Sequence, residues 1–187
     1  SRRSPKTAWF WSKGSKIVKA PQPIERHTMA VIVDNEPGVL ARVVGLFSGR
    51  GYNIESLTVA AVAADAGQSR INIVTSGTPM IIEQIKAQLK RLVPVLDVHD
   101  LTAEGAHIER DLALVKVVGK GADRLEALRI ADIFGATVAD TTLESFVFSL
   151  TGRPEKLDSF IELMRALGTV ELARSGVVAI ARGPKAI

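Results

Sequence analysis

Short β-branched runs alternate with apolar residues at helical spacing in the first half of the chain. The run at residues 28–34 predicts a buried strand. Residues 40–47 have apolar side chains three and four positions apart, and the pattern stops at Gly49-Arg50-Gly51, as in an amphipathic helix. The next predicted elements are strands at 54–62 and 70–75 joined by a Gly/Asp turn, a helix at 81–92 and a strand at 95–101. This βαββαβ order is that of a ferredoxin-like unit.

The second half of the chain repeats this order. Strands are predicted at 112–118, 137–140 and 145–150, helices over 125–134 and 160–167, and the end is strand-like. We therefore predict an α+β protein with two tandem ferredoxin-like βαββαβ sandwiches. The expected divisions are a tail at 1–26, a first domain at 27–102 and a C-terminal domain at 103–187. A linker is expected around 102–110, where Ala-Glu-Gly-Ala-His interrupts the periodicity.

Two strands of the first half carry small and polar residues on one face. Successive side chains of a strand point to opposite faces of the sheet. The small and polar set comprises Ser56, Thr58, Ala60, Arg70 and Asn72. The apolar residues between them are expected to pack under the helices. The polar set is then expected to leave an open face or edge that can dock a partner without the second domain.

The positive charge of the chain is concentrated at its start. Residues 1–26 carry a net charge of +6 and the remainder carries −2, which together give the +4 of the whole chain. The body therefore offers phosphate no basic face, and no nucleic-acid partner is expected. The tail, with Trp9-Phe10-Trp11, lacks periodicity. It is compatible with a disordered leader, a remnant of an organelle-targeting segment or a binding arm.

Residues for catalysis are scarce. The chain has no cysteine, which excludes disulfides, thiol catalysis and thiolate metal sites. Its three histidines, at positions 27, 99 and 107, have no second histidine at i, i+4, and no metal site is predicted. Asp97 and His99 share a strand face, but no nucleophile lies near them in the sequence. We predict no catalytic residues and no enzymatic activity.

A nucleotide loop and a membrane span are not expected either. Gly119-Lys120-Gly121 begins like a dinucleotide-binding loop, but Arg124 stands where the third glycine is needed. This segment therefore predicts a tight turn. No apolar run reaches the roughly 18 residues of a membrane span, so a soluble protein is expected.

The corner between the first strand and the first helix is the most unusual segment. It runs Asp34-Asn35-Glu36-Pro37-Gly38-Val39-Leu40. Asn35 is a good helix-cap residue, and Gly38 leaves room for a ligand to approach the backbone. The amides of a first helical turn are unpaired and favour an anion such as an α-carboxylate. A well-capped helix with no ligand explains the same residues.

Residues 34–43 resemble the signature of ACT domains, which are small βαββαβ modules that bind amino acids at a dimer interface. Residues 45–59, Gly-Leu-Phe-Ser-Gly-Arg-Gly-Tyr-Asn-Ile-Glu-Ser-Leu-Thr-Val, are similar to the small subunits of acetohydroxyacid synthase (acetolactate synthase). The segments 84–93, 110–117 and 173–178 agree with this, and the resemblance covers residues 26–187.

The resemblance implies a regulatory subunit that activates a separate catalytic subunit and mediates feedback inhibition by valine in branched-chain amino-acid biosynthesis. The thiamine diphosphate, Mg2+ and FAD of that family belong to the catalytic subunit, so this chain is expected to hold no cofactor. The implied partners are the catalytic subunit, a second copy of the chain through the ACT domains, and valine. The implied compartment is the cytoplasm, or an organelle lumen if the tail is a targeting remnant.

The resemblance also places an effector site between two ACT domains. The loop residues Asn35, Glu36, Gly38, Val39 and Leu40 of one chain are expected to face Asn53 and Ile54 of the other chain. Amides after Gly38 and the Asn53 side chain then hold the valine carboxylate, and the apolar residues seat the isopropyl group. A free-standing ACT-domain sensor of another amino acid is the alternative within the binding class.

Overall fold

The computed structural model describes residues 22–63, 67–184 and 186–187. Most of the predicted tail therefore lies outside the described residues. Its last two residues, Glu25 and Arg26, begin the first strand, three residues earlier than the hydrophobic pattern predicts. They pair with Ser76 and Gly77 of a neighbouring strand, so backbone pairing extends the strand beyond its apolar run.

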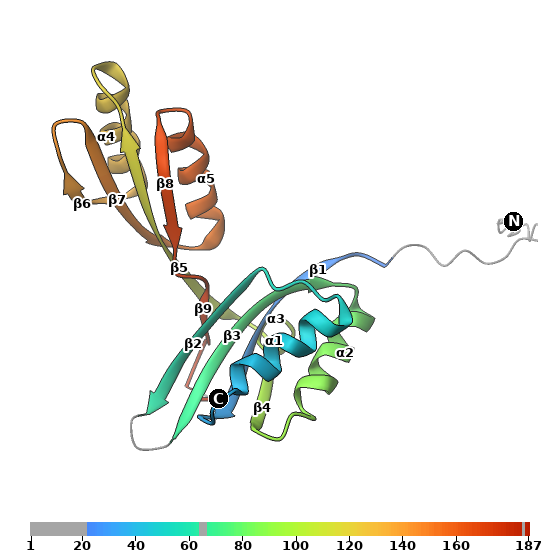
Figure 1. The fold of residues 1–187 in the computed structure, drawn as a ribbon. Coiled ribbons are helices and arrows are strands. Elements are labelled where there is room, and N and C mark those ends of the chain that lie inside the picture. Colours follow the sequence, from blue (N-terminus) through green and yellow to red (C-terminus); the bar gives the residue numbers. More distant parts are fainter. Residues whose placement is uncertain (1–21, 64–66, 185) are drawn as a thin grey trace, which may run out of the picture.

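The first module is a four-stranded antiparallel sheet with two helices (Figure 1). Its elements are β1 (Glu25–Asp34), α1 (Val39–Arg50), β2 (Ser56–Ala63), β3 (Gln68–Gly77), α2 (Pro79–Leu89) and β4 (Val95–Asp100). The sheet order is β2-β3-β1-β4, so β2 and β4 are the edge strands. The helices pack on one face, over a core that includes Val43 and Phe47 of α1 and Ile71 and Ile73 of β3.

The second module repeats this architecture with its own core. Its elements are β5 (His107–Val118), α4 (Ala122–Phe134), β6 (Thr137–Thr141), β7 (Ser145–Gly152), α5 (Pro154–Arg165), β8 (Thr169–Arg174) and β9 (Val178–Ala181). The sheet order is β6-β7-β5-β8. Its core contains three phenylalanines, Phe146 and Phe148 of β7 and Phe160 of α5. The prediction of two tandem ferredoxin-like sandwiches is confirmed.

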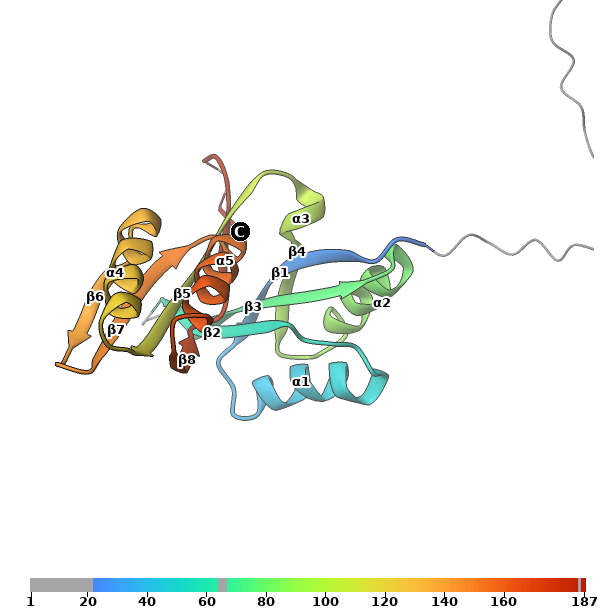
Figure 2. The ribbon, with the colours of Figure 1, turned by 90° about the horizontal axis from the view of Figure 1, so that it is seen from above.

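The junction between the modules is shorter than the predicted linker. A single helical turn, α3 (Leu101–Glu104), follows β4, and β5 begins three residues later. The first four residues of β5 pair with β9, whereas the next eight pair with β7 in the second sheet. From His107 to Arg110 half-buried and exposed residues alternate, as they do in a strand. Gly105 interrupts the sequence pattern just before this strand. In Figures 1 and 2, β5 and β9 occupy the region where the two modules meet.

The predicted open face of the first sheet is covered. Ala30, Leu101 and Ala179 form a small buried cluster, and the segment leading into β9 crosses the polar residues of β2 and β3. Thr58 donates a hydrogen bond to the Val177 carbonyl at 3.1 Å, and Arg70 donates to the Ala179 carbonyl at 2.7 Å. The prediction of an open face is wrong at Thr58 and Arg70, because these side chains bind the backbone in and just before β9. The alternative of an open edge agrees with the structure, in which β2 is an edge strand.

Candidate functional site

The corner after β1 is held by backbone hydrogen bonds at both sides. The Asp34 amide donates to the Pro94 carbonyl at 2.8 Å, and the Asn35 amide donates to the Gly67 carbonyl at 2.7 Å. Gly38 has φ +83° and is the N-cap of α1, with no side chain capping the helix. The prediction of Asn35 as the cap is wrong. The helix starts only after the turn at Pro37-Gly38, so Asn35 lies too early to reach its amides.

The start of α1 presents free backbone donors beside exposed side chains. Among the described residues, the amides of Leu40 and Ala41 have no hydrogen-bond acceptor. A Cβ added at Gly38 would meet no atom within 4 Å, so the space beside this glycine, at the start of the helix, is open. Asn35, Glu36 and Leu40 are exposed. The arrangement can accept an anion at the positive end of the helix dipole.

Val39 differs from the other residues of the corner. Its side chain is 7% exposed and packs in the first core with Val43 and Phe47. Its amide donates to the Glu36 carbonyl at 3.3 Å. The apolar side chain that the corner offers to solvent is Leu40, which is 39% exposed.

The other two predicted residues lie at the far end of α1. Gly51, at φ +69°, ends the helix, and the Gly51 and Tyr52 amides donate to the Ser48 and Phe47 carbonyls. Asn53 is exposed, and its carbonyl accepts a hydrogen bond of 2.6 Å from the Thr75 hydroxyl. Ile54 is half-buried against the first core.

The length of α1 separates the two groups of predicted residues. The helix has 12 residues, so its ends lie about 18 Å apart. The structure therefore brings residues 35–40 together and places Asn53 and Ile54 at the opposite end. A single chain does not form one amino-acid-sized site from both groups.

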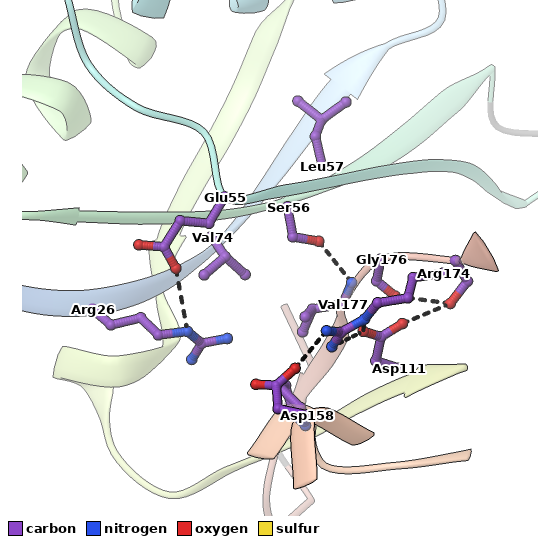
Figure 3. Close-up of a pocket in the computed structure, with 12 residues that line it drawn as sticks. Arg26, Glu55, Ser56, Leu57, Val74, Asp111, Asp158, Arg174, Gly176 and Val177 are labelled. Atoms are coloured by element: carbon purple, nitrogen blue, oxygen red, sulfur yellow. Dashed lines mark hydrogen bonds and ion pairs between the residues drawn. The ribbon is translucent and has the colours of Figure 1, made fainter. Parts of the chain in front are cut away.

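A cavity of about 470 Å³ lies between the two modules (Figure 3), and sequence reasoning missed it. It is lined by Arg26, Glu55 and Ser56 of the first module and by Asp111, Asp158 and Arg174 of the second. None of the predicted effector residues lines it. Its residues come from segments far apart in the sequence, so no local motif announced it.

Ion pairs order this cavity. The Arg174 guanidinium bonds Asp111 at 2.5 Å and Asp158 at 2.6 Å. Burial acts to lower the pKa of Arg174, but the hydrogen bonds to the two carboxylates outweigh it and raise the pKa. On the first-module side, Arg26 pairs with Glu109 at 3.1 Å. Burial acts to raise the pKa of Glu109, but its hydrogen bonds from Thr28 and Arg26 and the charge of Arg26 bring the pKa below its usual value.

The histidines take part in local pairs. His27 bonds the buried Asp100 at 2.9 Å, and His99 lies 3.0 Å from Asp97, with which it was predicted to share a face. The pKa of Asp97 is lowered, chiefly because its carboxylate accepts the Val98 amide hydrogen bond. Within residues 22–63, 67–184 and 186–187, no group of three or more acidic or histidine side chains is placed to hold a metal. In the same residues no helix is long and apolar enough to cross a membrane.

The fold is that of an ACT module followed by a second α+β module. The model of the AHAS small subunit-like ACT domain matches residues 29–97, and that of the small subunit of acetolactate synthase matches 110–183. The acetolactate synthase isozyme 3 small subunit of Escherichia coli is 46% identical over 161 residues, covering 86% of this chain and 98% of that protein.

Two further relatives agree. The probable acetolactate synthase small subunit of Archaeoglobus fulgidus is 44% identical over 160 residues, covering 86% of this chain and 99% of that protein. The crystal structure of the acetolactate synthase small subunit from Thermotoga maritima has a TM-score of 0.75 at 35% identity, covering 86% of this chain and 99% of that one. The chain belongs to the family of acetolactate synthase small subunits.

Proposed function

We propose that this protein is the regulatory subunit of acetohydroxyacid synthase, that it activates the catalytic subunit, and that it mediates feedback inhibition by valine. Family membership supports the partner. The observation that carries the sensor role is the start of α1, where unpaired amides, an open Gly38 and the exposed Leu40 lie together. These groups suit the carboxylate and the apolar side chain of an amino acid.

The chemistry proposed for this chain is binding alone. Thiamine diphosphate, Mg2+ and FAD are assigned to the catalytic subunit, and no residue here is assigned a catalytic role. In the proposed site, the amides that follow Gly38 and the Asn53 side chain hold the valine carboxylate. The Glu36 carboxylate is available for the ammonium group. Leu40 and Ile54 bury the isopropyl group, which contributes about 1.5–3 kcal/mol.

The proposed sensor is a homodimer through the ACT modules. Because the two groups of effector residues lie at opposite ends of α1, an antiparallel pairing of two α1 helices brings the Gly38 end of one chain to the Asn53 end of the other. A two-fold axis then creates two identical sites. Exposed apolar residues are available for such an interface, namely Leu40 and Val44 one turn apart on α1 and Val59 and Val62 on the edge strand β2.

The proposal also covers the domain bounds and the compartment of the protein. The ACT domain is assigned to residues 27–102 and the C-terminal domain to 103–187, with β5 and β9 contacting both modules. The proposed compartment is the cytoplasm, with an organelle lumen as the alternative.

Reconstitution with a cognate catalytic subunit tests the proposed function. Adding this chain is expected to raise acetolactate formation, and adding valine is expected to return the rate toward that of the catalytic subunit alone. Alanine, which has the same charged groups and a smaller side chain, is the matched control ligand and is expected to inhibit weakly. If a saturating concentration of this chain does not stimulate the catalytic subunit, the assignment to this enzyme is contradicted. Stimulation that no branched-chain amino acid reverses would contradict the feedback role.

A further inference from the structure

The residues that follow the proposed effector site also bind the C-terminal segment. Asn53 and Ile54 are separated from β2 by Glu55 alone, and Ser56 is the first residue of the strand. The Ser56 hydroxyl oxygen accepts a 2.7 Å hydrogen bond from the Val177 amide (Figure 3). Thr58, two residues on, donates to the carbonyl of the same residue at 3.1 Å. Both backbone groups of Val177 are therefore held by the strand that begins at the proposed site.

This contact is close enough to transmit a displacement. Gly176 lies at φ +89°, and a Cβ added there would be 2.8 Å from the Thr58 methyl carbon and 3.0 Å from the Ser56 hydroxyl oxygen. The Asn72 side chain donates to the Thr58 hydroxyl at 3.1 Å and fixes it against β3. A shift of β2 along its length is therefore expected to move Val177 with it, because two hydrogen bonds join the strand to this residue.

The other side of the same turn is attached to the second module. The Ser175 hydroxyl donates to Asp111 at 3.1 Å, and the Ser175 amide donates to the Leu112 carbonyl at 3.0 Å. The adjacent Arg174 joins Asp111 of β5 to Asp158 of α5. The four residues from Arg174 to Val177 thus connect the strand after the proposed site to a strand and a helix of the second module.

We infer that the Arg174–Val177 turn is the relay by which an amino acid at Asn53 and Ile54 changes the position of the second module. Ser56 and Thr58 are its positioning residues, and they act through Val177 rather than on the ligand. Valine shifts the arrangement of the modules only if it binds the two arrangements unequally. The turn supplies that inequality, since the continuous segment from Asn53 to Thr58 contains both the proposed ligand contacts and the two side chains that bind Val177. The inference rests on the proposed function.

The test compares substitutions at two glycines that have similar positive φ angles. It uses the full-length protein in complex with its catalytic partner. Gly176→Ala places a Cβ against Thr58 and Ser56, whereas Gly183→Ala has the same kind of positive φ, +93°, with no atom within 4 Å. Gly176→Ala is expected to bind valine in calorimetry and to activate the enzyme. The valine concentration needed for half inhibition should rise at least about fivefold, the lower end of typical allosteric couplings. Gly183→Ala should respond like the unmodified chain.

Ser56→Ala tests the relay independently, in case Gly176→Ala proves unstable. It removes the acceptor of the Val177 amide, and Ser159→Ala, on an exposed part of α5, is its control. Valine is expected to change the hydrogen-exchange rate of the Val177 amide in the unmodified chain and in Ser159→Ala, but not in Ser56→Ala. If Ser56→Ala keeps full valine inhibition, and valine still changes the exchange rate of its Val177 amide, the relay is overturned. Loss of valine binding in Gly176→Ala with binding kept in Gly183→Ala would overturn it too, because the turn would then belong to the site. An unmodified chain that fails to respond to valine would instead refute the proposed function.

Discussion

Replacing Gly38 by aspartate is expected to give a subunit that still activates the catalytic partner but no longer responds to valine. The new carboxylate would occupy the open space before the Leu40 and Ala41 amides, where the ligand's carboxylate is proposed to bind. Two like charges about 4 Å apart near a protein surface repel by roughly 1–4 kcal/mol, which corresponds to a loss of valine affinity of about 5-fold to about 900-fold. A negative charge is favourable at this helix end, so α1 should persist.

Gly38→Asn is the matched control for this variant. Any side chain at φ +83° costs backbone free energy, but asparagine and aspartate tolerate this region better than other residues and have nearly the same shape. The two variants therefore share the strain and differ in charge. Calorimetric titration with valine should show much weaker binding to Gly38→Asp than to Gly38→Asn. Equal affinity in both variants would place the effector site away from this corner.

Truncating Phe148 to alanine is expected to unfold the second module while leaving valine binding in place. Phe148 is fully buried, and its ring centroid lies 6.3 Å from that of Phe160 and 5.4 Å from that of Phe146. Removing such a ring from a core costs about 3–5 kcal/mol. That is a large part of the 5–15 kcal/mol that stabilises a typical domain. The first core shares no residue with this one, so the ACT module should keep its fold.

The Phe148→Ala variant separates valine binding from the inhibition that follows it. Phe148→Ala is expected to bind valine but to show little valine inhibition in the reconstituted enzyme, because the module that responds is disordered. Leu143→Ala, at a position that is 95% exposed, is the control and should behave like the unmodified chain. Differential scanning calorimetry should resolve an early transition in Phe148→Ala alone. Full valine inhibition despite that transition would show that the second module is dispensable for the response.

The two sandwiches were predictable from sequence because each helix and strand is marked locally. Apolar spacing, glycine stops and β-branched runs are properties of neighbouring residues, and they gave the order of the elements in both halves. The pairing of β9 with the first residues of β5 was not predictable in this way. It joins His107 to Ala181 across the whole second module, and the polar residues of β2 and β3 give no sign of what covers them.

The proposed effector site was only partly accessible to the same reasoning. The sequence of the corner indicated a helix start open to a ligand, and the structure places Gly38 and free amides there. It did not indicate that Val39 faces the core, since the direction of a helical side chain depends on where the helix begins. The junction cavity depends on ion pairs such as Arg174–Asp111, which are 63 residues apart, so local patterns carry no information about it.

The central claim is that each valine site is shared between two chains, and a mixed dimer tests it most directly. Gly38→Asp damages the start of α1 and Asn53→Ala damages its other end, so neither homodimer should bind valine. A heterodimer purified through two different tags would combine both defects in one site and leave the other site intact. Calorimetry of this heterodimer should therefore give about one valine per dimer, half the stoichiometry of the unmodified dimer. No binding by the heterodimer would contradict the account, because it would place all the contacts of each site within one chain.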